Sequence, residues 1–363
     1  MGEQESVMRV GLIAPLPPPF GGMANQAIQL CGLLESEGVS VTQVQTNAPY
    51  QPEFIGRVRV VRALFRLIPY LFRLWRVTGR VDVLHLFANS GWSWQLFSAP
   101  AVWIAWLRRT PIIVNYRGGE AGEYLSRSLH WVRPTLNRAD AIVVPSGFLH
   151  EVFQGVGIDT EIIPNIIDPE RFESCPERME RYRLGPHLVI TRNLEPIYGI
   201  ETAIRAVDAL SSDFPRVKLS IAGEGPQRDQ LQSMVRKLGL EGVVNFTGKL
   251  TPEQIASLYH EADIMLNPTT VDNMPNSVLE SLAAGIPVIT TNAGGIPFIV
   301  KDGVTALMVE MDDAEGMAAQ VRRLLNDPSL FASLAENGKN QVLAYTWSKI
   351  KQQWLDRYAQ STL

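Results

Sequence analysis

The chain has little cysteine, no excess of positive charge and no signal for export. Its 363 residues include two cysteines, Cys31 and Cys175, too few for a disulfide framework or a cysteine-rich metal site, which is typical of a reducing compartment. The formal net charge is −4, so no overall positive field attracts nucleic acid. The first residues, MGEQESVMRV, lack the basic and apolar regions of a secretory signal. They match the Met-Gly-x-x-x-Ser pattern of myristoylation, but we favour a short acidic leader in a cytoplasmic protein.

Two common nucleotide-binding motifs are also missing. Neither half of the chain has Gly-x-Gly-x-x-Gly after its first strand, and no Walker A pattern occurs. A nicotinamide-dependent enzyme is therefore disfavoured. Gly21 and Gly22 do follow the first expected strand. Glycines there let backbone N–H groups approach a phosphate, although most such pairs serve turn geometry.

Short apolar segments alternate with helical patterns along most of the chain, and 46% hydrophobic residues are enough for substantial cores. The expected strands are 9–14, 39–41, 81–86, 111–115 and 141–144, then 188–190, 218–222, 243–246, 264–266 and 288–290. This order predicts an α/β protein with two Rossmann-like doubly wound domains facing across a cleft. We expect an N-terminal domain over 1–175, a C-terminal domain over 176–345, and a closing helix over 346–363.

The most informative segment runs from residue 271 to 288. It places Asp272 in a loop, then a helix that Pro275 is expected to open at its first position, then a Gly285-Ile286-Pro287 stop before a buried strand. The N–H groups and positive dipole end of such a helix suit a phosphate. Glu280 lies in the second turn and leans back toward the helix start, so both carboxylates can reach one pocket. The alternative is a capped core helix with two incidental acids.

This spacing resembles the acidic-x7-acidic signature of the retaining family 4 glycosyltransferases, which have the GT-B fold. The resemblance implies that Glu280 holds the ribose of a nucleoside-diphosphate sugar and that Asp272 holds the donor sugar. Asp272 stands where the family usually has Glu.

The segment from Arg192 to Gly199 resembles the Arg-x5-Lys-Gly segment of that family, in which both cations neutralise the donor diphosphate. Arg192 fits this role, because its guanidinium fork matches phosphate oxygens and keeps its charge; a surface arginine is the alternative. Tyr198 occupies the Lys position, which leaves one cation fewer. The resemblance implies donor-binding roles for Gly21, Gly22, Gly223, Glu224, Lys249, Leu250, Asn273, Met274, Pro275, Asn276 and Glu280. The Gly294-Gly295-Ile296-Pro297 segment completes the family pattern.

In the first half, Arg117 lies where many relatives have a His near the donor sugar. An arginine can bind a phosphate of donor or acceptor but cannot act as a general base. With Arg192 and Asp272 it completes the expected catalytic set. His85, at another strand end, is either a satisfied buried histidine or a ligand contact.

Seven arginines and no acidic residue occur between Arg57 and Arg80, interleaved with apolar and aromatic residues. This pattern predicts either a helix in an anionic membrane interface or a core-packed helix with solvated arginines. Pro69 should kink the helix, and the segment lacks the apolar run of about 20 residues that spanning requires. The nearby Trp92, Trp94, Trp103 and Trp106 are expected to extend the surface.

The resemblance extends from residue 9 to the final helix. It implies transfer of a sugar from a UDP- or GDP-sugar to a hydroxyl of a glycan or lipid-linked acceptor, with retention of configuration. No Asp-x-Asp occurs in the sequence, which fits a GT-B enzyme without metal or other cofactor. The enzyme is expected in the cytoplasm or on the cytoplasmic membrane face. A GT-B sugar-nucleotide epimerase and a catalytically inactive GT-B binding partner remain alternatives.

Overall fold

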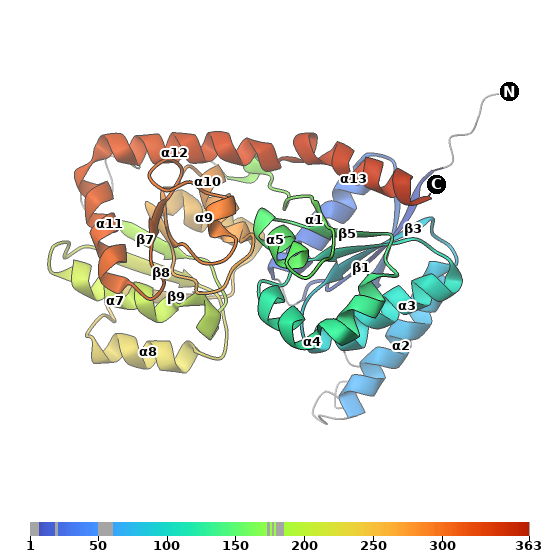
Figure 1. Cartoon of the computed structure of the whole chain (residues 1–363). Helices are drawn as coiled ribbons and strands as arrows, with labels where there is room; N and C mark the ends of the chain where they lie inside the picture. The colour runs from blue at the N-terminus through green and yellow to red at the C-terminus, as the bar shows by residue number, and fades with distance from the viewer. Residues whose placement is uncertain are drawn as a thin grey trace. The chain divides into compact units, whose positions relative to one another are not determined.

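The computed structural model describes residues 7–18, 21–49, 61–172, 175, 178 and 185–362, and it divides into two compact units. The first unit comprises Met1–Ile166 and Ile350–Leu363, and the second comprises Ile167–Lys349. The sequence places these boundaries at 175/176 and 345/346. Each unit contains its own six-stranded parallel sheet with helices around it (Figure 1), as predicted for two Rossmann-like domains.

The sheet of the first unit has the strand order β2-β1-β3-β4-β5-β6. Its strands are β1 (Arg9–Ala14), β2 (Ser40–Gln45), β3 (Val83–Ala88), β4 (Ile112–Tyr116), β5 (Ala141–Val144) and β6 (Glu161–Ile162). Every residue of β3 and β4 is buried, because helices cover both faces of a parallel sheet. The order reverses between β1 and β3, where a crevice forms at the carboxyl ends of the strands in this class of fold.

The helices of the first unit are α1 (Gly22–Ser36), α2 (Val61–Thr78), α3 (Ala99–Arg108), α4 (Ala121–Leu136), α5 (Gly147–Gln154) and most of α13 (Trp347–Thr362). Figure 1 shows α2, α3 and α4 on one face of the sheet and α1 with α13 on the other. A π-helical turn, η2 (Trp94–Ser98), precedes α3. Its first residue, Trp94, lies in the core with 1% of the residue exposed, so the prediction that Trp94 belongs to an exposed aromatic surface is wrong.

Helix α13 packs along the first sheet through side chains four residues apart. Ile350, Trp354 and Tyr358 are buried, as their helical spacing predicts. The Trp354 ring lies 4.5 Å from the ring of His85 on β3, and the Tyr358 hydroxyl is 2.7 Å from His85 Nδ1. The last helix of the sequence therefore belongs to the core of the first unit.

The second unit has the strand order β12-β11-β10-β7-β8-β9. Its strands are β7 (His187–Ile190), β8 (Lys218–Ala222), β9 (Val244–Gly248), β10 (Ile264–Asn267), β11 (Val288–Thr291) and β12 (Leu307–Val309). Its helices are α7 (Ile200–Ser211), α8 (Arg228–Lys237), α9 (Pro252–Glu261), α10 (Asn276–Ala283), α11 (Ala314–Asn326) and α12 (Pro328–Val342), with 3-10 turns η3 (Pro169–Arg171), η5 (Pro196–Tyr198), η6 (Ile296–Phe298) and η7 (Leu343–Tyr345). The order reverses between β7 and β10, so this pair marks the switch point of the second sheet.

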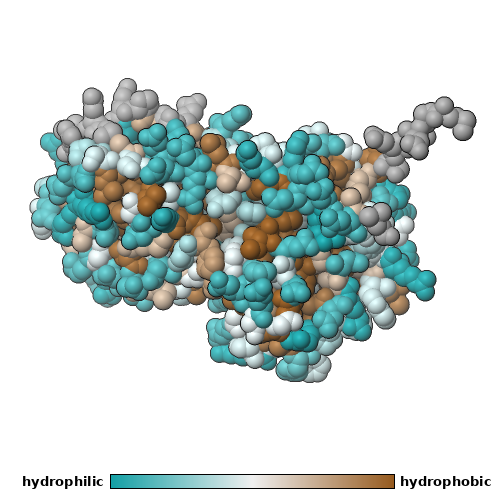
Figure 2. All heavy atoms as spheres, turned by 45° about the horizontal axis from the view of Figure 1, so that its top comes forward, coloured by the Kyte–Doolittle hydropathy of each residue, from teal (hydrophilic) through white to brown (hydrophobic). Residues whose placement is uncertain are grey.

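On the face drawn in Figure 2, hydrophilic residues cover most of the area and apolar residues emerge in separate patches. Among the helices that the structure describes, none combines the length and the apolar content that crossing a bilayer requires.

Candidate active site

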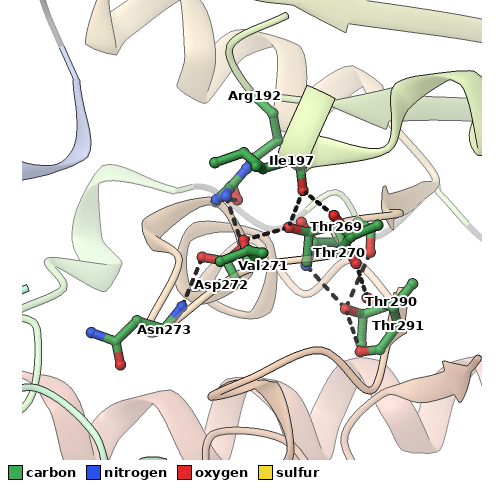
Figure 3. A network of polar contacts seen from close by, with 11 residues as sticks. Arg192, Ile197, Thr269, Thr270, Val271, Asp272, Asn273, Thr290 and Thr291 are labelled. Carbon is green, nitrogen blue, oxygen red and sulfur yellow. Dashed lines mark hydrogen bonds and ion pairs between the residues drawn. The ribbon is translucent and has the colours of Figure 1, made fainter. Parts of the chain in front are cut away.

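The chain segments after β7 and β10 meet because these two strands are parallel neighbours at the switch point. Met265 of β10 pairs with Val189 of β7, so both strands end at the same edge of the sheet. Thr270 binds the segment after β10 to the turn η5, since its backbone N–H and its hydroxyl both donate to the Ile197 carbonyl, at 2.8 and 3.2 Å. Thr269 donates to the same carbonyl at 3.1 Å (Figure 3). These bonds hold the segment that carries Arg192 against the segment that carries Asp272.

Arg192 and Asp272 form a nearly buried ion pair at this edge. Arg192 Nη2 lies 2.7 Å from Asp272 Oδ2, and each side chain is 10% exposed. The guanidinium carbon stacks 4.0 Å from the centre of the Tyr198 ring, and Nη1 reaches Ser277 Oγ at 3.4 Å. The buried Arg192 Nε–H has no hydrogen-bond partner among the described residues, so one donor edge of the fork stays available for a ligand oxygen.

The Asp272 carboxylate is held from both sides. Its Oδ1 accepts from the Asn273 N–H at 3.1 Å, while Oδ2 accepts from Arg192. Burial raises the pKa of Asp272 above its ordinary value, and the nearby Arg192 charge opposes that rise. The Asp272 carboxylate therefore has protein partners but little contact with water. A ligand hydroxyl that reaches it can replace one of these partners.

Glu280 lies on the second turn of α10. Its Oε2 accepts from the Tyr259 hydroxyl at 3.2 Å, and the same hydroxyl is hydrogen-bonded to Thr191 Oγ1, next to Arg192. Burial raises the pKa of Glu280, while the Tyr259 hydrogen bond and the charges of Arg171 and Arg192 oppose the rise. Thr191 and Tyr259 thus link Glu280 to the segment that carries the ion pair.

Helix α10 begins one residue later than predicted. Pro275 has extended backbone angles and occupies the N-cap, so it precedes the helix rather than opening it; this is a correction of one position. The predicted stop is present. Gly285 has φ +65, and the N–H groups of Gly285 and Ile286 donate to Leu282 and Ser281 in a Schellman arrangement.

Gly294 and Gly295 follow β11 and pack against the backbone beside Asp272. A Cβ at Gly294 would strike the Asp272 carbonyl, and a Cβ at Gly295 would strike the Asn273 carbonyl. The Gly295 N–H also donates to the Asp272 carbonyl at 3.0 Å. The second glycine pair of the family pattern therefore shapes the acidic loop by close backbone approach.

Replacing Gly295 with alanine should lower the free energy of unfolding by about 1–3 kcal/mol, because the new methyl group forces the Asn273 carbonyl to move in a packed loop. Gly242→Ala is the matched control, since nothing lies within 4 Å of its Cβ position. Urea unfolding of both variants measures the difference. Equal free energies of unfolding for the two variants would show that the Asn273 carbonyl can move without loss of stability.

The other predicted donor-binding residues of the second unit lie at the same edge of its sheet. Gly223 and Glu224 follow β8, and Lys249 and Leu250 follow β9. The Gly223 N–H donates to the Gly248 carbonyl at 2.9 Å, and a Cβ at Gly223 would strike the Arg192 carbonyl. The Glu224 side chain is 61% exposed and 3.7 Å from Arg228. Asn273, Met274 and Asn276 complete the set in the loop and at the start of α10.

The predicted residues of the first unit lie at the corresponding edge of the first sheet. Gly21 is the extended N-cap of α1 and Gly22 its first residue, with nothing within 4 Å of a Cβ at Gly21. Arg117 follows β4 and donates to the side-chain oxygens of Asn115 and Asn165. Its guanidinium lies 5.1 Å from the Phe87 ring, and burial lowers the pKa of Arg117 to about 9. None of the ion pairs between described residues includes Arg117.

His85 is a satisfied buried histidine, one of the two alternatives that the sequence left open. Its Nδ1 is bonded to the Tyr358 hydroxyl, and its Nε2 is 3.0 Å from Asn115 Nδ2. Burial, and next the charge of Arg117, lower the pKa of His85 to about 3. The imidazole is therefore neutral and has a partner on both nitrogens.

Three residues at the site were missed from the sequence. Ser277 lies inside the 271–288 segment and could have been found by its place in the first turn of α10. Thr191 directly follows β7, which is a position where ligand contacts occur in this class of fold. Tyr259 sits on α9 with an ordinary core pattern, so no local signal marks it.

Two family models match most of the chain. The model for Glycosyltransferase Family 4 matches residues 20–171, and the model for Glycosyl transferases group 1 matches residues 184–341. Glycogen synthase of Mycobacterium tuberculosis is 31% identical over 286 residues, covering 75% of this chain and 67% of the relative. Phosphatidyl-myo-inositol mannosyltransferase of Mycolicibacterium smegmatis is 25% identical over 373 residues, covering 97% and 93%.

A crystal structure of Anabaena HepE in complex with UDP-glucose has a similar fold, with a TM-score of 0.74 at 17% identity over 97% of this chain and all of that one. The first family model lies mostly within the first unit, and the second lies within the second unit. The chain belongs to the family 4 glycosyltransferases and has the GT-B fold.

Proposed function

We propose that this glycosyltransferase moves a hexose from a UDP- or GDP-sugar to a hydroxyl of a lipid-linked or cell-surface glycan precursor, with retention of configuration and without a metal ion. The observation that carries the proposal is the placement of Arg192, Asp272 and Glu280 at the switch point of the second sheet. The HepE complex with UDP-glucose and the mannosyltransferase named for phosphatidyl-myo-inositol support a sugar-nucleotide donor and a lipid acceptor. The proposed location is the cytoplasm or the cytoplasmic face of the membrane.

The donor diphosphate would bind at Arg192 and the start of α10. The free Nε–H of Arg192 offers a charge-assisted hydrogen bond, and the N-terminal end of α10 adds a positive dipole without a side-chain cap. Asp272 reaches the donor sugar from the loop before α10, and Glu280 accepts from the ribose hydroxyls. Gly223, Glu224, Lys249 and Leu250 border the nucleotide base.

The acceptor proton would pass to the leaving diphosphate. His85 and Arg117 are unsuited to act as a general base, since the pKa of His85 is lowered to about 3 and the guanidinium of Arg117 is a cation. The absence of Asp-x-Asp from the sequence supports charge stabilisation by protein groups alone. Arg117 has no carboxylate partner among the described ion pairs, which supports a role in binding a phosphate of donor or acceptor.

Two alternatives use the same fold. A GT-B epimerase shares the donor site and needs no acceptor. An inactive binding partner is favoured by Tyr198, which removes a cation, and by Asp272, which neutralises the remaining arginine at 2.7 Å. Both alternatives differ from the proposal in their products: the epimerase forms an isomerised donor, and the inactive partner forms no product.

The test supplies UDP- and GDP-sugars separately, with polyprenyl-phosphate- and glycolipid-linked sugars as acceptors. We expect release of one nucleoside diphosphate that depends on the acceptor, equal rates with and without EDTA, and a product with the donor's anomeric configuration by proton NMR. Loss of activity in EDTA, or an inverted product, would contradict the metal-independent retaining reaction. An isomerised donor without acceptor indicates the epimerase, and nucleotide binding without turnover indicates the inactive partner.

A further inference from the structure

Helix α2 has apolar side chains on two different faces. One row, formed by Leu67, Tyr70, Leu71, Leu74 and Val77, packs into the core of the first unit. A second row consists of Phe65, Ile68, Phe72 and Trp75, which are 48%, 63%, 64% and 42% exposed. Their spacing of three, four and three residues places them in one stripe along the helix. Packing onto the sheet needs only the first row, so the folding of this unit does not account for the second.

Arginines border the exposed stripe. Arg73 and Arg76 are exposed on α2, and the Arg76 guanidinium lies 5.6 Å from the Phe72 ring. Residues 54–119 contain ten arginines and one acidic residue, Asp82, whereas the whole chain carries a net charge of −4. Asp82 is paired with Arg9 at 2.5 Å. The first unit therefore concentrates positive charge in the part of the chain that exposes apolar side chains.

Helix α3 continues this surface. It packs beside α2, as Figure 1 shows, and exposes Trp106 by 53% and Leu107 by 64%. Arg108 of α3 lies 4.7 Å above the Trp75 ring of α2, so a guanidinium joins the two helices. Arg138, after α4, lies 5.0 Å from the Trp106 ring. Aromatic rings and guanidinium groups thus alternate across two adjacent helices.

We propose that the exposed residues of α2, of the turn after it and of α3, here called the α2–α3 surface (Phe65, Ile68, Phe72, Trp75, Trp106, Leu107 and the arginines at 73, 76, 80 and 108), bind the anionic surface of a lipid bilayer. Separate apolar side chains can enter the acyl boundary while arginine heads stay at the phosphates, and tryptophan favours that depth. A second copy of the chain is a poor occupant, because a two-fold contact would bring two arginine-rich surfaces together. The inference does not depend on the donor chemistry proposed above.

Two sets of substitutions separate the apolar and the electrostatic contributions. In one, Phe65, Ile68 and Phe72 are changed together to Ser; in the other, Arg73, Arg76 and Arg80 are changed together to Gln. All six residues are exposed, so both variants should fold. Co-sedimentation with phosphatidylcholine vesicles of increasing phosphatidylglycerol content measures the partition coefficient. Wild type should bind more with more anionic lipid and less with added salt, and loss of three cations should weaken binding about a hundred-fold.

Matched controls lie in the second unit. Arg216, Arg236 and Lys237 changed to Gln remove the same charge from exposed positions, and Val304, Met311 and Leu343 changed to Ser remove exposed apolar groups. Both controls should bind vesicles like wild type, and all four variants should keep wild-type nucleotide affinity by calorimetry. Negligible binding of wild type, or equal binding by all proteins, would overturn the proposal. A wild-type dimer in sedimentation that only the Ser variant of α2 loses would overturn it in favour of a second copy.

Discussion

Replacing Arg192 with alanine is expected to lower turnover by about a hundred- to a thousand-fold, with a much smaller rise in the donor Michaelis constant. The leaving diphosphate gains charge as the glycosidic bond breaks, so a guanidinium beside it stabilises the transition state more than the bound donor. Tyr198 stands at the position where a second cation is usual, which leaves Arg192 to supply this charge alone in its segment. The measurement is steady-state kinetics with varied donor at saturating acceptor.

Stability must be measured beside activity, because the substitution leaves Asp272 buried without its partner. Breaking a buried pair can cost about 3–5 kcal/mol, although protonation of Asp272, whose pKa burial already raises, should reduce that cost. Arg192→Lys keeps the charge and should recover only part of the turnover, since an ammonium lacks the fork. Arg216→Ala, at an exposed position of the same unit, is the control. If the folded Arg192→Ala enzyme has wild-type turnover, Arg192 does not stabilise the transition state.

Tyr198 gives the site a different electrostatic balance from that of a relative with lysine there. The Tyr198 ring stacks on the Arg192 guanidinium at 4.0 Å and carries no charge of its own. We therefore expect the single, stacked cation of Arg192 to provide the charge stabilisation that two cations provide where this segment has a lysine.

The fold could be predicted from the sequence because its signals are local. Apolar segments such as 218–222 have the length and composition of buried parallel strands, and the stop at Gly285 needs a left-handed residue that glycine supplies. The predicted start of α10 was wrong by one residue, because the fixed φ of Pro275 suits both the N-cap and the first helical position. Patterns of this kind depend on a few neighbouring residues, so they can be recognised without knowledge of the tertiary structure.

What could not be predicted depends on contacts between distant segments. Trp94 is buried with its ring 6.0 Å from that of Tyr116, whereas the sequence grouped it with the neighbouring tryptophans as one surface. Tyr259 bonds to Glu280 and Thr191 from another helix, and His85 obtains its partner from Tyr358, 273 residues later. The two apolar faces of α2 could be counted in the sequence, but only the packing of Leu74 and Tyr70 shows which face is covered.

Glu280 should determine nucleotide affinity. A carboxylate that accepts from two ribose hydroxyls contributes on the order of 1–3 kcal/mol, so Glu280→Ala should weaken binding of the nucleoside diphosphate about ten-fold or more. Glu336→Ala, an exposed glutamate on α12, should bind like wild type. Isothermal titration calorimetry of both variants gives the comparison, and unfolding curves show that each is folded. Unchanged affinity of Glu280→Ala would exclude this residue from the donor site.

The pH dependence gives a second test of the same role. Burial raises the pKa of Glu280, so on acidification the carboxylate takes up a proton at a higher pH than an ordinary glutamate, and nucleotide affinity should fall there. The Tyr259 hydroxyl donates to Glu280 at 3.2 Å and stabilises the charged form, so Tyr259→Phe should move the fall to a higher pH. In Glu280→Gln the part of the fall that belongs to Glu280 should disappear, and the titrations of Asp272 and of the nucleotide's own phosphate should remain. A wild-type profile that Glu280→Gln reproduces would mean that the proton is taken up elsewhere, because a neutral amide cannot titrate in this range.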